Sequence, residues 1–196
     1  MWLRAAERAA LFLRDNLWDA NTGVLLRRWR QGHAAIDGYA EDYACLAWGL
    51  LELFEATGDP SWLAWARDLQ AQLDERFWDD VAAGWFSTTG DDPSVLLRRK
   101  EDYDGAEPAA SSVAVANLLR LVHLAPDASA MTRIERTLAR GGQAIGQAAR
   151  AVPFMLANLA TYHAGLRQLV IVGADDDPGT RALHDAAAAR YLPFTI

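Results

Sequence analysis

The chain has 196 residues, of which 52% are apolar and 10% aromatic, and it carries a formal net charge of −7. A chain of this length and composition can bury a substantial core as a single domain. The acidic balance argues against a nucleic-acid-binding surface, because binding to phosphates requires clustered Lys and Arg. No apolar stretch approaches the ~20 residues that span a bilayer. Neither nucleic acid nor a membrane is expected as a partner.

The amino-terminal residues and the single cysteine bear on location and redox chemistry. The start of the chain contains an acid among arginines, which does not fit a secretory signal, so we expect a cytoplasmic protein. Cys45 is the only cysteine, which excludes an intramolecular disulfide and a zinc site built from several thiolates. No metal-ligand spacing, GxGxxG or GxSxG motif is present. The sequence therefore predicts neither a metal nor a cofactor, and Cys45 is expected to be a small buried residue.

A unit of helix, loop and helix occurs twice. The first helix, expected over residues 2–17, ends in Leu17-Trp18-Asp19, and the helix over 61–77 ends in Phe77-Trp78-Asp79. In each copy a loop with an Asp-Gly pair, Asp37-Gly38 or Asp104-Gly105, then opens an apolar helix. A repeat of two helices per unit indicates an α/α solenoid or toroid.

The helices of the two units differ in polarity. Residues 61–77 carry one apolar stripe, formed by Trp62, Trp65, Leu69, Leu73 and Phe77, which predicts a helix with one wet face. The helices over 39–57 and 108–124 are apolar nearly all round, which predicts burial on both sides. Two concentric rings of helices would produce this alternation, with the partly solvent-exposed helices in the outer ring and the buried helices in the inner ring.

The remaining segments complete the predicted organisation. A fifth helix is expected over 128–150 with a break near Gly141-Gly142, and a sixth follows Pro153, which together make three helical hairpins. Residues 85–89 and 95–99 are predicted to form a small protruding β-hairpin. Residues 169–173 read as a strand and 179–191 as a helix. We expect a mostly α protein with an α/α-hairpin domain at 1–166 and a strand-helix appendage at 167–196.

Several of these segments together resemble a known family. They are Asp37-Gly38-Tyr39-Ala40-Glu41-Asp42-Tyr43, residues 51–59, Phe77-Trp78-Asp79, residues 102–108 and Val170-Ile171-Val172-Gly173. They are similar to the C-terminal part of thioredoxin-domain-containing proteins related to the spermatogenesis-associated protein family. That resemblance implies an (α/α)6 toroid similar to six-hairpin glycosidases and N-acylglucosamine 2-epimerase. This chain would supply about three of the six hairpins, without the thioredoxin-like domain.

The loops before the inner helices of such a ring border its central cavity, and here they are acidic. Glycoside hydrolysis needs a pair of carboxylates, one acid and one base or nucleophile, on facing elements. The alternative is that carboxylates at helix starts cap free backbone N–H groups. The candidate catalytic residues are Asp37, Asp42, Asp104 and Glu107.

Aromatic residues and one histidine accompany these carboxylates. The candidate ligand-binding residues are Tyr39, Tyr43, Trp85 and Tyr103, whose rings would stack on a sugar, and His33. An epimerase-like reaction would use a histidine as acid and base, because its pKa lies near working pH. Core packing is the alternative for the aromatic rings.

Three functions follow from these patterns. The first is a partial toroid domain that acts as a scaffold or binds a small, carbohydrate-like molecule without catalysis of its own. The second is a sugar-active hydrolase or epimerase that uses the loop carboxylates. The third is a protein-interaction module, because half a ring exposes the apolar flanks of its terminal hairpins to a second copy or to a complementary amino-terminal half.

Overall fold

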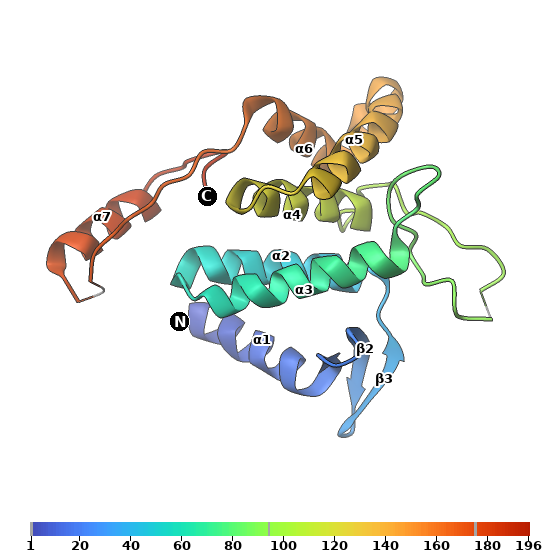
Figure 1. Cartoon of the computed structure of the whole chain (residues 1–196), viewed down its shortest axis with the longest axis horizontal. Coiled ribbons are helices and arrows are strands. Elements are labelled where there is room, and N and C mark those ends of the chain that lie inside the picture. Colours follow the sequence, from blue (N-terminus) through green and yellow to red (C-terminus); the bar gives the residue numbers. More distant parts are fainter. Residues whose placement is uncertain (1, 94, 175) are drawn as a thin grey trace.

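The computed structural model describes residues 2–93, 95–174 and 176–196 (Figure 1). Within these residues it is 59% helical, with seven α-helices and a three-stranded antiparallel sheet, which confirms the mostly helical prediction. The helices are α1 (Trp2–Leu17), α2 (Ala40–Thr57), α3 (Pro60–Phe77), α4 (Ala110–Leu124), α5 (Ala128–Ala148), α6 (Pro153–Ala164) and α7 (Pro178–Ala188). The strands are β1 (Trp18–Asp19), β2 (Val24–Arg30) and β3 (His33–Asp37).

Helix boundaries follow local capping chemistry. Gly58 adopts a left-handed conformation (φ 70°) that ends α2, and the Asp59 side chain accepts a hydrogen bond from the Ser61 N–H at the start of α3. Asp127 caps α5 in the same way. The predicted break at Gly141-Gly142 is wrong, because α5 continues as one helix to Ala148. Isolated glycines lower helix propensity without ending a helix that packs against its neighbours.

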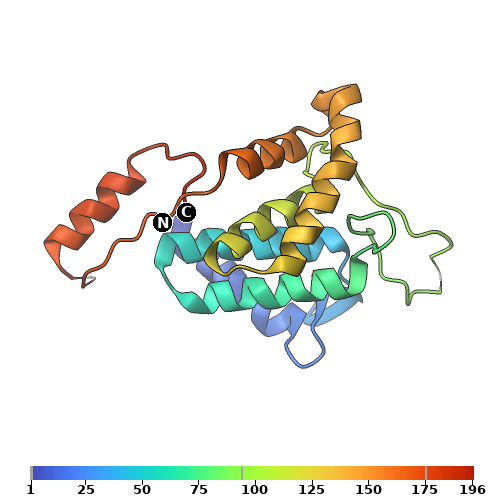
Figure 2. The same cartoon turned by 45° about the horizontal axis from the view of Figure 1, so that its top comes forward.

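The core lies where α2 packs between α3 and α4 (Figure 2). All five residues of the predicted α3 stripe are buried, which confirms that pattern. At the α2–α4 contact Ala44, Ala47 and Val113 are fully buried, and the buried Asn117 side chain donates to the Ala44 carbonyl at 2.9 Å. Small side chains let these two helices approach closely, and the amide bond fixes their register.

One face of α2 is open. Cys45 and Gly49 are exposed, so the predictions of a buried Cys45 and of a helix covered on both sides are wrong. Helix α4 contacts α2 and α6, as well as α3 and α5. Apolar composition alone does not tell whether small residues pack against a neighbour or line an open face.

The β-hairpin forms elsewhere than predicted. Strands β2 and β3 pair antiparallel, joined by a two-residue turn at Gln31 and Gly32 with φ of 52° and 80°. In residues 85–99, of which Ser94 lies outside the described residues, no strand forms. Instead the Phe86 N–H donates to the Phe77 carbonyl, and Trp85 forms an isolated antiparallel β-bridge with Trp78. The Ser87 N–H donates to the Arg99 carbonyl. This segment is therefore tied to the end of α3.

The last part of the chain, residues 167–196, contains an exposed helix. Helix α7 has no buried residue, and Figures 1 and 2 show it standing apart from the other helices. The predicted strand at 169–173 is wrong, because only a single parallel bridge, Arg167 with Thr195, forms in this region. A β-branched run needs a partner strand of matching length, and none is present among the described residues. No described helix has both the length and the apolarity needed to cross a membrane.

Candidate functional site

The carboxylates predicted at the start of α2 are bound by local partners. Asp42 accepts a hydrogen bond from the Tyr39 N–H at 2.7 Å and completes a capping box. Arg27 on β2 lies 3.5 Å from Asp42 and 3.3 Å from Glu41. Asp37 is exposed at the end of β3. The capping hydrogen bond and the Arg27 contacts hold the connection between β3 and α2, whereas Asp37 remains exposed to solvent.

Asp104 joins the starts of two helices. Its side chain is buried, and Oδ1 accepts from the Ala109 N–H at 2.9 Å, the residue that precedes α4. Oδ2 accepts from the Phe154 and Met155 N–H groups of α6 at 2.9 and 3.0 Å. An ionised carboxylate is acceptor-only, and both of its oxygens are used here. The geometry is that of a cap shared by α4 and α6.

Two of the predicted carboxylates, Asp42 and Glu107, affect the pKa of Cys45. Although Cys45 is exposed, neighbouring atoms partly desolvate its thiol and raise the thiol pKa, and the charges of Glu41, Glu107 and Asp42 raise it further. Glu41 and Asp42 lie in the first turn of α2, and Glu107 lies in the loop before α4. Glu107 is exposed there, whereas Asp104 is turned to the backbone. A thiol with a raised pKa is a poor nucleophile, which argues against a reactive Cys45.

The predicted ligand-binding aromatics divide into buried and exposed residues. Tyr43 and Trp85 lie in the core, and the Tyr43 hydroxyl accepts from Leu25 and donates to Gly23. Tyr103 is 61% exposed, and Tyr39 is exposed with the Arg27 guanidinium 4.0 Å from its ring centre. His33 is exposed at the turn of the β2–β3 hairpin. The structure does not bring these five side chains together around one cavity.

Sequence reasoning missed a half-buried carboxylate on α3, Asp74. Its Oδ1 accepts from Trp85 Nε1 and Gln70 Nε2, both at 2.9 Å, and its Oδ2 lies 3.8 Å from Arg133 on α5. Burial raises the pKa of Asp74 to about 6, and the arginine and the two hydrogen bonds only partly oppose this. Asp74 lies among polar residues of α3, so no signal in the sequence distinguishes it from a solvated aspartate.

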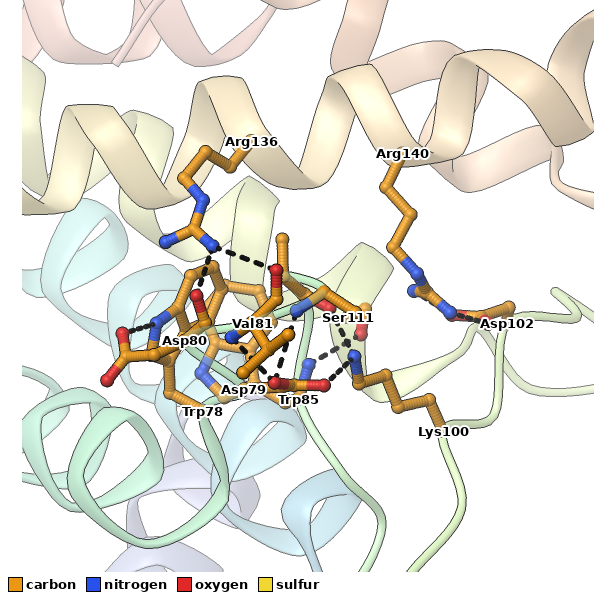
Figure 3. Close-up of polar contacts among 12 residues, drawn as sticks. Trp78, Asp79, Asp80, Val81, Trp85, Lys100, Asp102, Ser111, Arg136 and Arg140 are labelled. Atoms are coloured by element: carbon orange, nitrogen blue, oxygen red, sulfur yellow. Dashed lines mark hydrogen bonds and ion pairs between the residues drawn. The ribbon is translucent and has the colours of Figure 1, made fainter.

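A second missed cluster holds the loop after α3 (Figure 3). Lys100, the only lysine of the chain, donates to Asp79 Oδ2 and to the Ala83 carbonyl, both at 2.6 Å. Hydrogen bonding to Lys100 lowers the pKa of Asp79 to about 2. From α5, Arg136 donates to the Asp80 carbonyl and lies 5.5 Å from the Trp78 ring centre. The Lys100 contacts therefore join the loop after α3 to the segment that carries Lys100, and the Arg136 contacts join this loop to α5.

Beside this cluster lies a cavity of about 350 Å³. It is bordered by α5, by the starts of α4 and α6, and by the loop that carries Asp102. Arg140 of α5 forms a two-pronged ion pair with Asp102, with one contact of 2.7 Å between Nη1 and Oδ1 (Figure 3). In the described part of the chain, no group of three or more His, Cys, Asp or Glu is placed to hold a metal ion.

The fold and these sites define a protein of packed helical hairpins with capped helix starts and a cavity of mixed polar and apolar lining beside α5. No protein-family model matches the chain. It is 34% identical over 200 residues to spermatogenesis-associated protein 20 of Rattus norvegicus, which covers 97% of this chain and 25% of that relative. The Homo sapiens protein of the same name gives the same identity and coverage. An uncharacterised protein of Caenorhabditis elegans is 32% identical over 164 residues, 84% of this chain and 22% of the relative.

The chain is thus homologous to a part of spermatogenesis-associated protein 20. It spans about a quarter of the length of the curated relatives it matches.

Proposed function

We propose that the chain is a helical scaffold domain of a larger protein and supplies about three of the six hairpins of an α/α toroid. The homology to a part of a protein about four times longer supports its being one domain of several. The order of contacts supports the ring: α2 contacts α4, α4 contacts α6, and α3 and α5 flank this row. In this proposal α2, α4 and α6 are the inner helices.

The observation that carries the scaffold role is the bonding of Asp104. A general acid or nucleophile needs a carboxyl oxygen that faces a substrate. Both oxygens of Asp104 are instead occupied by backbone N–H groups at the starts of α4 and α6. The residue therefore joins two inner helices, which is a structural task.

Substitution of Asp104 tests this role. In Asp104→Ala three backbone N–H groups lose their acceptor, so we expect the free energy of unfolding to fall by roughly 3 kcal/mol. Glu107→Gln is the matched control in the same loop, and because Glu107 is exposed it should change stability by less than about 0.5 kcal/mol. Chemical denaturation followed by circular dichroism measures both. Equal stability of the two variants would contradict the scaffold role of Asp104.

A sugar-active enzyme is the second candidate, and one observation favours it. The charges of Asp42, in the first turn of α2, and Glu107, in the loop before α4, both raise the pKa of the Cys45 thiol. The test is hydrolysis of a panel of p-nitrophenyl glycosides by the chain, with Glu107→Gln as control. Turnover that Glu107→Gln abolishes would favour the enzyme. Absence of turnover in both the parent chain and Glu107→Gln would favour the scaffold role.

The exposed apolar side chains of the appendage support a protein partner that completes the ring. Val170, Val172, Leu183 and Tyr191 are exposed by 67%, 89%, 61% and 91%. Large exposed apolar patches mark interaction surfaces. The partner in this proposal is a second copy or the preceding half of the larger protein. Light scattering after size-exclusion chromatography tests the first: a mass of twice 21.5 kDa indicates a dimer, and a monomer assigns this surface to the rest of the larger protein.

A further inference from the structure

Two extended segments that flank α7 lie side by side in parallel. The Arg167 N–H donates to the Phe194 carbonyl at 2.7 Å, and the Ile196 N–H donates to the Arg167 carbonyl at 2.9 Å. The Leu169 N–H donates to the Ile196 carbonyl, also at 2.9 Å. Figures 1 and 2 show the two segments running together toward α7. Arg167 and Leu169 therefore direct their main-chain groups toward residues 194–196.

The opposite edge of residues 168–172 is open. Because the main-chain groups of successive residues in an extended chain point to opposite sides, Gln168, Val170 and Val172 direct theirs away from residues 194–196. The chain does not turn or bend before Gly173, and these three residues are exposed. Within the part of the chain that the structure describes, their N–H and C=O groups make no hydrogen bond. Such a row of free donors and acceptors is a template for another strand.

The side chains of this segment are apolar and lack cover. Leu169, Val170 and Val172 are 49%, 67% and 89% exposed, although parallel strands in folded proteins are normally covered on both faces. A sheet of two strands is only marginally stable in water, and three or more strands are needed for stability of its own. Residues 168–172 and 194–196 therefore lack strands that would complete a sheet.

The positions of the open groups identify the missing strand. They belong to Gln168, Val170 and Val172, which are symmetric about Val170. A second copy of this segment running antiparallel would set Val170 against Val170 and Gln168 against Val172, so that each open N–H faces a carbonyl. The charges agree with this direction. Arg167 precedes the apolar run and acidic residues, among them Asp176, follow it, so antiparallel copies bring opposite charges together at both ends.

We propose that the edge formed by residues 168–172 pairs antiparallel with the same edge of a second copy, about a two-fold axis at Val170. This pairing joins two parallel pairs into one four-stranded sheet and is the two-fold arrangement most common among homo-oligomers. The proposal rests on the interaction surface named under the proposed function and specifies its partner. The scaffold role is tested separately, by the stability of Asp104→Ala.

The full chain tests the pairing without any substitution. Light scattering after size-exclusion chromatography, over a series of protein concentrations, gives the fraction of dimer. Amide hydrogen exchange followed by NMR at the same concentrations gives the location of the contact. We expect a dimer whose formation slows exchange at the amides of Gln168, Val170 and Val172, because these N–H groups become hydrogen-bonded between the copies.

Substitutions at Val170 test the register. Val170→Lys sets two ammonium groups opposite each other, so the dimer Kd should rise at least about tenfold, and Val170→Asp should act in the same way. An equimolar mixture of the two variants should associate again, because a lysine then faces an aspartate. Leu183→Lys is the matched control, since Leu183 is 61% exposed on α7 and lies off this edge. It should dimerise like the parent chain.

Three results would overturn the proposal. A parent chain that stays monomeric at every concentration would assign the open edge to another protein segment. A dimer that Val170→Lys leaves intact would place the contact on a different surface. Failure of the mixed Val170→Lys and Val170→Asp chains to associate would exclude the two-fold axis at Val170. Circular dichroism of each variant checks that the fold persists, as expected for exposed positions.

Discussion

Two aspartates of the same neighbourhood, Asp74 within α3 and Asp79 in the loop that follows, have opposite pKa shifts at nearly equal exposure. Their side chains are 12% and 13% exposed. The pKa of Asp74 is raised to about 6, whereas that of Asp79 is lowered to about 2. Asp74 has two neutral donors and an arginine 3.8 Å away, but Asp79 has an ammonium group at 2.6 Å and two backbone N–H groups. Desolvation is the largest influence on Asp74 and raises its pKa, whereas at Asp79 the hydrogen bond to Lys100 outweighs desolvation and lowers it.

Removal of the Lys100 ammonium group should have the largest effect on this difference between Asp74 and Asp79. In Lys100→Met the Asp79 carboxylate loses its charged partner and the Ala83 carbonyl loses a donor, so we expect the free energy of unfolding at pH 7 to fall by roughly 3–5 kcal/mol. Denaturant titration measures the change. Arg99→Met, on the exposed neighbour, is the control and should change stability by less than about 0.5 kcal/mol.

The same variant has a pH signature. Because the folded pKa of Asp79 is about 2 and its ordinary value is 3.8, its contribution to stability is complete above pH 3.8 and is lost as pH falls through 2. Lys100→Met should weaken this acid dependence. An unchanged profile between pH 4 and pH 2 would show that the Asp79 shift does not come from Lys100.

Neutralisation of Asp74 should raise the free energy of unfolding at pH 7, by somewhat less than Lys100→Met lowers it. Its folded pKa of about 6 lies above 3.8, so the folded chain holds the proton more tightly, and this contribution to stability is lost as pH rises from 3.8 through 6. The gap corresponds to roughly 3 kcal/mol, and this value already includes the opposing attraction of Arg133. Asp74→Asn keeps an acceptor for Trp85 and Gln70, so we expect it to be more stable than the parent chain at pH 7.

Comparison with an exposed position of the same helix isolates this effect. Asp68→Asn should follow the parent chain across pH 4–7, whereas Asp74→Asn should lose the decline in stability over that range. Thermal unfolding at several pH values supplies both curves. If Asp74→Asn and the parent chain have parallel curves, Asp74 does not carry the raised pKa.

The smallest expected effect comes from Arg136, which contacts the loop after α3 through backbone carbonyls and the Trp78 ring. Arg136→Met removes hydrogen bonds to the Asp80 and Val81 carbonyls and a contact with the Trp78 ring, which should cost about 1 kcal/mol. Arg150→Met, at an exposed position after α5, is the control. A loss as large as that of Lys100→Met would mean that the loop depends equally on both cations.

The sequence by itself determined the helical elements and much of their packing. The start of α1 and the ends of α1, α2, α3 and α4 fall at the predicted residues, because the apolar period and the stop signals at Gly58 and Pro60 act within a few residues. The α3 stripe is buried as predicted. The acidic residues near the starts of α2 and α4 are also visible in the sequence, and the charges of Asp42 and Glu107 raise the pKa of Cys45.

Only the tertiary structure decided which strands form and what each carboxylate does. Strand pairing in β2–β3 and its absence at 169–173 depend on whether a partner lies alongside, which a local pattern does not encode. Asp104 contacts α6 some 50 positions along the chain, and Asp74 contacts Trp85 and Arg133 from other segments. Hydrogen bonding and desolvation depend on distances of a few ångströms, and those distances are set by the assembled hairpins.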